Sequence, residues 1–300
     1  MHESIKEKAA DLGFDLCGIA PVRFLENHAD SLFNWLEEGR HAGMSYMERN
    51  SEKRTDPSIL VPGSKSVIVA GMNYYREYNP PENKAIFSRY ALGKDYHKVL
   101  RDSLHILLDF IRRTKAGTEG RVFVDTAPVL ERAWAQEAGL GWAGKNSMLI
   151  NRDIGSFFFL GVLITNIELE YDKPALQDYC GNCRKCIDAC PTGAIREDRT
   201  INSNKCLSYL TIENKEDIPE EYAEIAGRRV FGCDICQEVC PWNKKAKETS
   251  IKEFEPLPEI LDYTTDQWKN ITEEEFYRIF SGSAVLRAGY RGFMRNVSIG

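Results

Sequence analysis

Four cysteines lie in the stretch CGNCRKCIDACPT, which runs from Cys180 to Thr192. Their spacing is C-x2-C-x2-C-x3-C, and a proline follows the fourth cysteine. This is the ligand spacing of bacterial ferredoxins, in which three thiolates wrap one [4Fe–4S] cluster and the fourth reaches a second cluster. The stretch therefore predicts iron–sulfur chemistry and electron transfer.

A second motif, Cys233-x2-Cys236-x3-Cys240 followed by a proline, repeats this pattern with one cysteine fewer. Val230 stands where a complete copy would have a cysteine, and Cys206 is the only candidate to replace it. The count then closes at eight ligands for two clusters. The crossed arrangement of two-cluster ferredoxins predicts Cys180, Cys183, Cys186 and Cys240 for cluster one, and Cys190, Cys206, Cys233 and Cys236 for cluster two.

Two other uses of the cysteines compete with this interpretation. Disulfides are rare in the cytoplasm, and the charged, helix-like N-terminal stretch MHESIKEKAADLGFD is not a signal peptide. Zinc sites favour two C-x2-C pairs separated by a longer loop, which this run does not match, so two zinc sites are the weaker alternative. The ninth cysteine, Cys17, lies in an apolar run and is predicted to be a buried small hydrophobic residue.

The composition of the 300-residue chain is ordinary, with 43% hydrophobic and 28% charged residues. This length is enough for two domains and a substantial core. No apolar run approaches the about 20 residues that cross a bilayer, so we expect a cytoplasmic protein with no membrane partner. The net charge of -6 gives no overall attraction for nucleic acid, so RNA binding would need a local basic patch or a further part of the protein.

Any catalytic site served by the clusters must be built by the first 170 residues. Hydrophobic periodicity predicts helices over 3–12, 22–39, 95–113 and 129–140. Strands are predicted over 14–21, 66–75, 121–125 and 156–165, with a long irregular loop over 41–66. The alternation of strands and helices indicates an α+β fold for residues 1–170.

The sequence pattern changes at Tyr171. From there hydrophobic periodicity weakens, and cysteines and turns with Gly and Pro become frequent. We expect residues 171–245 to form a small domain organised by its clusters. Residues 246–300 are polar and helical, with helices predicted over 266–281 and 283–298. The sequence stops inside this last helical pattern, so we expect it to be the start of a longer helical domain.

Four stretches occur here in the order RYALGKDYHKVL, VFVDTAPVLERAWAQEAGLGWAGKNSMLI, YCGNCRKCIDACPTGAI and FGCDICQEVCPWN. Together they resemble the epoxyqueuosine reductases, a family of cobalamin and iron–sulfur enzymes of tRNA modification. The resemblance covers nearly the whole chain, and its most specific part is the block VDTAPVLERAWAQEAGLGWAGKN, which ferredoxin modules lack. It implies a nitroreductase-like α/β domain that binds cobalamin, then a ferredoxin-like double-cluster domain and a helical-repeat domain that helps to bind tRNA.

The resemblance also implies the last step of queuosine biosynthesis. In this step, two-electron reduction removes the epoxide oxygen of epoxyqueuosine at the tRNA wobble position. The implied partners are the tRNA anticodon loop, whose unstacked nucleotides suit a site that takes up a flipped base, and an external electron donor. We expect a monomer. A set of basic residues could contact the tRNA backbone, although such runs are more often a solvated face: Arg228, Arg229, Lys244, Lys245 and Lys247.

Asp125 ends a predicted strand and matches the aspartate that the family uses as its proposed general acid. Expelling an epoxide oxygen leaves an alkoxide that needs a proton. A carboxylic acid can supply this proton if partial burial raises its pKa. Capping of the following helix is the alternative role that the residues alone would favour.

The resemblance implies cofactor contacts elsewhere. Tyr96 and His97, at a helix start, are expected to hydrogen-bond the corrin amides or the substrate without binding cobalt, and an ordinary surface histidine is the alternative. The block GLGWAGKNS is expected to approach the flat macrocycle closely, and a plain turn with a solvated lysine is the alternative. The predicted cofactor contacts are Asn73, Arg89, Tyr96, His97, Gly141, Trp142, Gly144, Lys145 and Asn146.

Two other functions stay open on the sequence alone. A cobalamin-dependent reductive dehalogenase would share this design and act on a small organohalide, but such proteins usually carry an export signal. A ferredoxin-like electron-transfer module would have the clusters and no cobalt. Cobalamin binding and a requirement for tRNA would distinguish the three functions.

Overall fold

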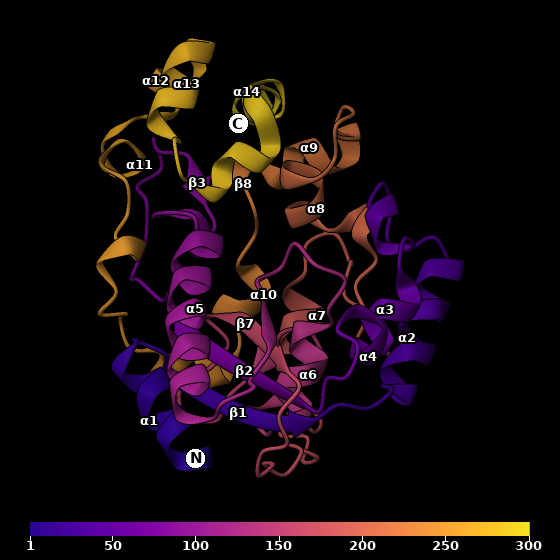
Figure 1. Cartoon of the computed structure of the whole chain (residues 1–300). Helices are drawn as coiled ribbons and strands as arrows, with labels where there is room; N and C mark the ends of the chain where they lie inside the picture. The colour runs from indigo at the N-terminus through magenta and orange to yellow at the C-terminus, as the bar shows by residue number, and fades with distance from the viewer. Residues whose placement is uncertain (300) are drawn as a thin grey trace.

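Four antiparallel strands form the central sheet, in the order β1-β2-β7-β4 (Figure 1). They are β1 (Leu16–Pro21), β2 (Ser66–Asn73), β7 (Phe158–Thr165) and β4 (Gly120–Phe123). The computed structural model describes residues 1–299. Every residue of β2 is buried, as expected for a strand in the middle of a sheet that is covered on both faces. All four strands lie within or beside the ranges predicted from the sequence.

Helices cover the two faces of this sheet. Successive side chains of a strand point to opposite faces, so Ile68 and Ala70 of β2 join one core while Val67 and Val69 join another. The first core also contains residues of α1 (His2–Asp11) and α5 (Tyr96–Thr114), and the second contains residues of α6 (Glu131–Glu137). The mixed α/β character predicted from the sequence is therefore confirmed, and no helix among residues 1–299 has the length and apolarity to cross a membrane.

The predicted loop over 41–66 is more ordered than expected. It follows α2 (Glu26–Glu37) and contains η1 (Ser45–Met47), α3 (Ser51–Thr55) and α4 (Pro57–Leu60). These helices are too short for periodicity to reveal. The start of α4 is nevertheless encoded by adjacent residues. Asp56 accepts a hydrogen bond from the backbone N–H of Ser58, and Pro57 stands at the first helical position.

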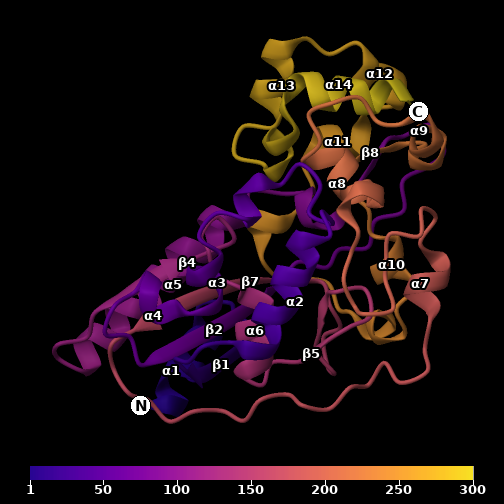
Figure 2. The same cartoon turned by 90° about the vertical axis from the view of Figure 1, so that its right-hand side faces the viewer.

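The cysteine-rich region consists of short elements that lie beside one end of the sheet. A long segment after β7 first runs past β1 and α6 (Figure 2). There the backbone N–H of Asp172 donates to Ile19 O, and the backbone N–H of Ala175 donates to Gln136 O. The region then contains α7 (Lys185–Ala189), η3 (Ser203–Lys205), α8 (Leu207–Ile212), α9 (Glu220–Ala226) and α10 (Ile235–Glu238). Two strand pairs that the sequence did not predict hold it in place: the hairpin of β5 (Trp142–Ala143) with β6 (Leu149–Ile150), and the parallel pair of β3 (Ile86–Phe87) with β8 (Arg229–Phe231).

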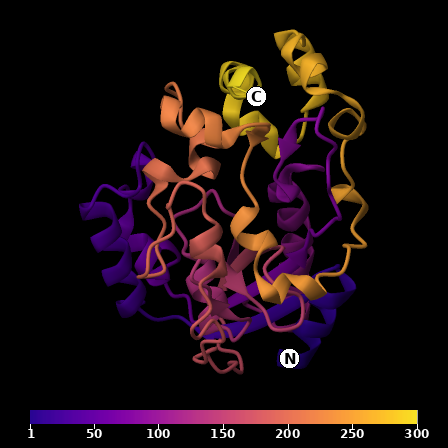
Figure 3. The same cartoon turned by 180° about the vertical axis from the view of Figure 1, so that it is seen from behind.

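The C-terminal helices lie at the opposite end of the molecule from the N-terminus (Figure 3). After η4 (Pro241–Lys245) and η5 (Lys252–Phe254) come α11 (Pro258–Asp262), α12 (Thr265–Lys269), α13 (Glu273–Ile279), η6 (Ala284–Ala288) and α14 (Gly289–Ile299). The single helix predicted over 266–281 is wrong, because a capping box at Thr272 starts a new helix. The helix predicted from 283 starts as a 3-10 turn, and the left-handed Gly289 (φ 71°) separates this turn from α14.

These helices share an aromatic core with earlier parts of the chain. Trp268, Phe276, Phe280 and Phe293 pack with Phe87 of β3 and Phe231 of β8. This core joins segments from all three predicted parts, 1–170, 171–245 and 246–300. The domain boundaries themselves stay a prediction.

Candidate active site and thiol sets

The four cysteines predicted for cluster one come together. Cys180, Cys183, Cys186 and Cys240 all line one cavity of about 270 Å³. Burial raises the pKa of Cys240, and the neighbouring charges of Cys180 and Cys183 raise it further. We call these four residues set one. Their convergence fits a group that binds four thiolates.

The other four predicted ligands also neighbour one another, and we call them set two. Burial raises the pKa of Cys206, and the charge of Cys190 adds to this effect. Burial likewise raises the pKa of Cys233 to about 12 and that of Cys236 well above its usual value, and Cys206 contributes to both. Cys206, isolated in the sequence, therefore lies beside Cys190, Cys233 and Cys236, where the incomplete second motif lacks a ligand.

The two sets adjoin each other. Cys186 of set one adds to the raised pKa of Cys236 in set two, and the helices that carry them, α7 and α10, pack together (Figure 2). No group of three or more His, Cys, Asp or Glu side chains among residues 1–299 is compact enough to hold a single metal ion. A [4Fe–4S] cluster binds each thiolate through a different iron and so holds its ligands farther apart.

The glycine-rich block GLGWAGKNS forms the β5–β6 hairpin against the thiols. A Cβ on Gly141 would lie 2.2 Å from Ile150 O, and one on Gly144 would lie 2.6 Å from Ile150 Cδ1. Closure of the hairpin is thus sufficient to require these glycines, and their approach to a macrocycle stays a prediction. Lys145 donates to Gly181 O at 2.8 Å, and both Lys145 and Asn146 line the set-one cavity.

The side chains of Asn73 and Arg89 have local structural partners. Asn73 is buried, and its amide donates to Lys247 O and accepts from Tyr75 N. The guanidinium of Arg89 is buried, donates to two backbone carbonyls, and pairs with Asp234 and Glu238 beside the second cysteine motif. Arg89 thus holds the fold beside Cys233 and Cys236, and Asn73 holds the segment at Lys247, so their roles as cofactor contacts stay a prediction.

Asp125 follows β4 with a left-handed backbone (φ 55°) that places its carboxylate against the start of α5. Tyr96 Oη donates to Asp125 Oδ2 at 2.8 Å, and His97 Nε2 lies 3.3 Å from the same oxygen. His97 Nδ1 in turn lies 2.6 Å from Asp95 Oδ1. Asp95 also caps α5 by accepting the backbone N–H of His97. One imidazole thus bridges two carboxylates.

This bridge sets the charges of the site. Burial lowers the pKa of His97, but its hydrogen bonds to Asp125 and Asp95 outweigh burial and raise the pKa from 6.5 to about 9. Burial raises the pKa of Asp125, but its hydrogen bonds from His97 and Tyr96 outweigh burial and lower the pKa below its usual value. The sequence-based expectation of a raised Asp125 pKa is therefore wrong. At neutral pH the proton lies on His97, one hydrogen bond away.

Asp125 lies in an open recess. Its side chain is 63% exposed, yet the surrounding protein still desolvates it. Arg132 shows the same combination. The residue is exposed to solvent, and yet desolvation by the surrounding protein lowers the pKa of its guanidinium. A side chain that solvent reaches and that the surrounding protein still desolvates indicates a concave surface. We call this surface, with Tyr46, Arg54, Asp125, Glu131 and Arg132, the Asp125 recess.

Sequence reasoning missed Glu131, the first residue of α6. Burial raises its pKa to about 7, and the charge of Asp125 contributes. Its Oε1 atom is buried and has no hydrogen-bond partner among residues 1–299, and the same holds for Arg54 Nε. An acidic residue in a first helical turn normally indicates only a favourable helix dipole. Nothing in the local pattern marked it as part of the site.

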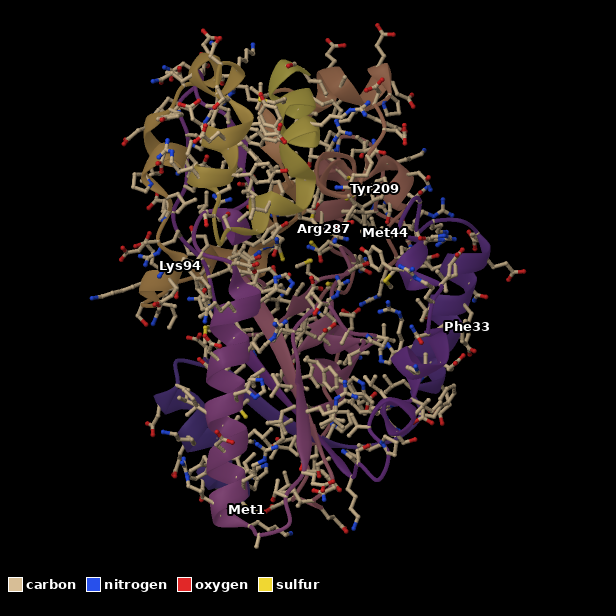
Figure 4. All side chains as sticks on the ribbon, turned by 45° about the horizontal axis from the view of Figure 1, so that its top comes forward. Met1, Phe33, Met44, Lys94, Tyr209 and Arg287 are labelled. Atoms are coloured by element: carbon tan, nitrogen blue, oxygen red, sulfur yellow. The ribbon has the colours of Figure 1, made fainter. Side chains whose placement is uncertain are left out.

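The loop that carries Tyr46 is tied to the cysteine-rich and C-terminal parts. Arg287 forms a two-pronged ion pair with Glu213, with both contacts at 2.8 Å, and its guanidinium lies 5.8 Å from the centre of the Tyr46 ring. Tyr209 Oη accepts the backbone N–H of Gly43 at 2.8 Å. Figure 4 shows Met44, Tyr209 and Arg287 gathered at this junction. The loop residues are thus anchored at the edge of the Asp125 recess.

Comparisons with known proteins match the whole chain. A family model described as epoxyqueuosine reductase QueG matches residues 54–126, and a 4Fe-4S double cluster binding domain matches residues 179–243. A curated relative from Cyclobacterium marinum, named epoxyqueuosine reductase, is 48% identical over 98% of this chain and 94% of its own length.

Two solved structures agree with the fold. A crystal structure of epoxyqueuosine reductase with an epoxyqueuosine-modified tRNA-Tyr stem loop has a TM-score of 0.93 and 35% identity, covering 99% of this chain and 80% of that one. The enzyme from Bacillus subtilis, with its catalytic loop swung out of the active site, has a TM-score of 0.92 and 34% identity over the same shares of the two chains.

Proposed function

Since the chain belongs to the epoxyqueuosine reductase family of oxidoreductases, we propose that it reduces epoxyqueuosine in the anticodon loop of a tRNA to queuosine. The observation that carries the proposal is the full-length relationship to named epoxyqueuosine reductases. The convergence of eight cysteines into two sets beside the Asp125 recess supports it. Set one would hold one [4Fe–4S] cluster and set two the other, as the crossed ligand pattern predicts.

Cobalamin fits the recess by the chemistry of its wall. Arg54 Nε and Glu131 Oε1 are buried and have no partner among residues 1–299, and the corrin rim carries amides that both donate and accept hydrogen bonds. Tyr46, Arg54 and Arg132 would hold that rim, with Tyr96 and His97 on the side of α5. When bound, the clusters and cobalamin supply the two electrons of the reaction.

A chain of tyrosines, of which Tyr74 is buried and Tyr90 and Tyr96 are partly buried, leads from set two toward the recess. Tyr74 lies near Cys236 and hydrogen-bonds Gln237. Tyr90, which is partly buried, lies near Tyr74 and packs edge-on against Tyr96, which donates to Asp125. We therefore place cluster two on the inner side, next to the recess, and cluster one on the side that receives electrons from the external donor.

The reaction also requires two protons. Breaking both C–O bonds of the epoxide by two-electron reduction leaves an alkene, and the oxygen departs as water after taking up two protons. Asp125 would deliver the first proton as it takes one from His97 through their shared hydrogen bond, since an anionic carboxylate has none of its own to give. Glu131, which titrates near neutral pH, is the second proton-holding group beside Asp125.

The test is anaerobic turnover of an anticodon stem loop that carries epoxyqueuosine, with queuosine measured by mass spectrometry. The protein would first be reconstituted with iron, sulfide and cobalamin and then desalted. We expect about eight iron atoms per chain from ligand counting, one cobalt atom, and queuosine that forms only with both metals present.

Asp125→Asn is the matched inactive control. A loaded protein that reduces an organohalide and leaves the stem loop untouched would support the dehalogenase alternative. Full iron with no cobalt retained would leave an electron-transfer module.

A further inference from the structure

Trp142 lies directly against set one. Its side chain is only 4% exposed, and its ring lies 4.9 Å from that of Tyr179 and 5.0 Å from that of Trp242. Cys180 and Cys240 pack in the same small apolar cluster. The indole is therefore held firmly next to two of the four thiols.

The hairpin register places Trp142 on the same face as a residue that lines the set-one cavity. Trp142 on β5 pairs directly with Ile150 on β6, and side chains of directly paired residues stand on the same face of a hairpin. Ile150 lines the cavity that contains the four thiols, as do Tyr179 and Trp242. The ring neighbours of Trp142 are thus themselves walls of this cavity.

The indole nitrogen of Trp142 is a buried donor without an acceptor. No hydrogen-bond partner for Nε1 exists among residues 1–299, and the atom is closed to solvent. An unpaired buried donor is unfavourable, and in native proteins it is rare. Trp268 Nε1 is also unpaired, but it lies in the aromatic core with Phe87 and Phe280. Only the unpaired indole of Trp142 has thiol ligands beside it.

We propose that the indole N–H of Trp142 donates a hydrogen bond to a sulfur atom of the cluster held by set one, and that this bond raises the reduction potential of that cluster. The proposal rests on the proposed function, because it requires a cluster at these thiols. Hydrogen bonds to cluster sulfurs are one of the determinants of the potential. The reduced cluster carries one more negative charge, so a donor stabilises it more than the oxidised form.

Trp142→Phe removes the N–H and keeps an aromatic ring. In a potentiometric titration of the reconstituted protein, followed by electron paramagnetic resonance, we expect one of the two cluster signals to move to lower potential while the other stays in place. Trp242→Phe is the matched control, since Trp242 lines the same cavity but its nitrogen is not a buried, unpaired atom. Its titration should follow the wild type.

Iron content separates this inference from the proposed function. Wild-type protein that binds no iron would defeat the proposed function. Trp142→Phe with full iron and two unshifted signals would overturn the role of Trp142 and leave the clusters intact.

If Trp142→Phe assembles no cluster, the wild type still provides a test. Protein labelled with ¹⁵N in the indole ring should show a ¹⁵N coupling to a reduced cluster in pulsed resonance spectra, and Trp242→Phe should retain this coupling. A labelled wild type without the coupling would also overturn the proposal.

Discussion

The central sheet and the cysteine-rich region owe their order to different interactions. Every residue of β2 is buried, and each face of the sheet has its own large apolar core. In contrast, α7, which carries Cys186, has no buried residue, and the apolar cluster beside set one has only three buried members. Burial of apolar side chains stabilises a sheet with such cores, whereas a region with so small a core depends on its bound clusters for stability. Loss of a cluster should therefore loosen one region and leave the other folded.

The largest effect is expected from the ligand that stands alone in the sequence. Cys206→Ser removes one thiolate from set two, so we expect iron to fall from about eight to about four atoms per chain. Hydrogen exchange should rise across set two while β2 and β7 stay protected. Elemental analysis and exchange mass spectrometry measure both effects.

Cys17→Ala is the control for this experiment. Cys17 packs against the sheet core, and burial raises its pKa to about 12, so this variant should keep all its iron. Full iron content in Cys206→Ser would contradict the assignment of set two.

Asp125→Asn should abolish most catalysis without loosening either region. Proton transfer by a positioned group contributes roughly 10²- to 10⁴-fold, and we expect turnover to fall within that range. Asparagine tolerates the left-handed backbone of this position, so the fold should be unaffected. Stem-loop turnover, iron content and Tm are the measurements. Turnover close to wild type would remove Asp125 from the reaction.

His97→Gln should have a smaller effect, which depends on pH. The wild-type His97 pKa of about 9 means that the proton is present at neutral pH and is lost as the pH rises through about 9. Wild-type turnover should fall over that range. The His97 contribution to stability, complete below pH 6.5, should be lost over the same rise.

The variant should start about 10²-fold lower and lack this alkaline fall. A pH profile of turnover for both proteins provides the check. An identical alkaline fall in the two proteins would assign the titration to another group.

The smallest effect is expected at Glu131. Between pH 4.5 and about 7 the folded protein holds a proton on Glu131 that the unfolded chain has lost, so the wild type loses stability as the pH rises through this window. Glu131→Gln has no such loss, so the Tm of the variant minus the Tm of the wild type should increase as the pH rises across the same window. Glu7→Gln, at an exposed position on α1, is the control. Parallel Tm curves for wild type and Glu131→Gln would show that this carboxyl is not buried in its neutral form.

The thiol sets could be predicted from the sequence because cluster ligation is a matter of spacing and number. Two motifs lacked one ligand between them, and Cys206 was the only cysteine available; the structure places it beside Cys190. Prediction at the Asp125 recess was less complete. Asp125 was predicted through the family block, but the raised pKa that an acid there would need is absent. The reason is that Asp95 and His97, which set this pKa, belong to a different element from β4.

The amino-acid sequence by itself determined the family and the strands and long helices of the sheet, and it predicted eight thiols divided into two sets. These follow from local spacing and hydrophobic periodicity. Only the tertiary structure decided which groups carry protons, that Glu131 belongs to the recess, and that Arg89 and the hairpin glycines have structural partners. The physical reason is that a pKa or a close contact depends on what lies opposite in space. Chain segments far apart in the sequence supply those neighbours.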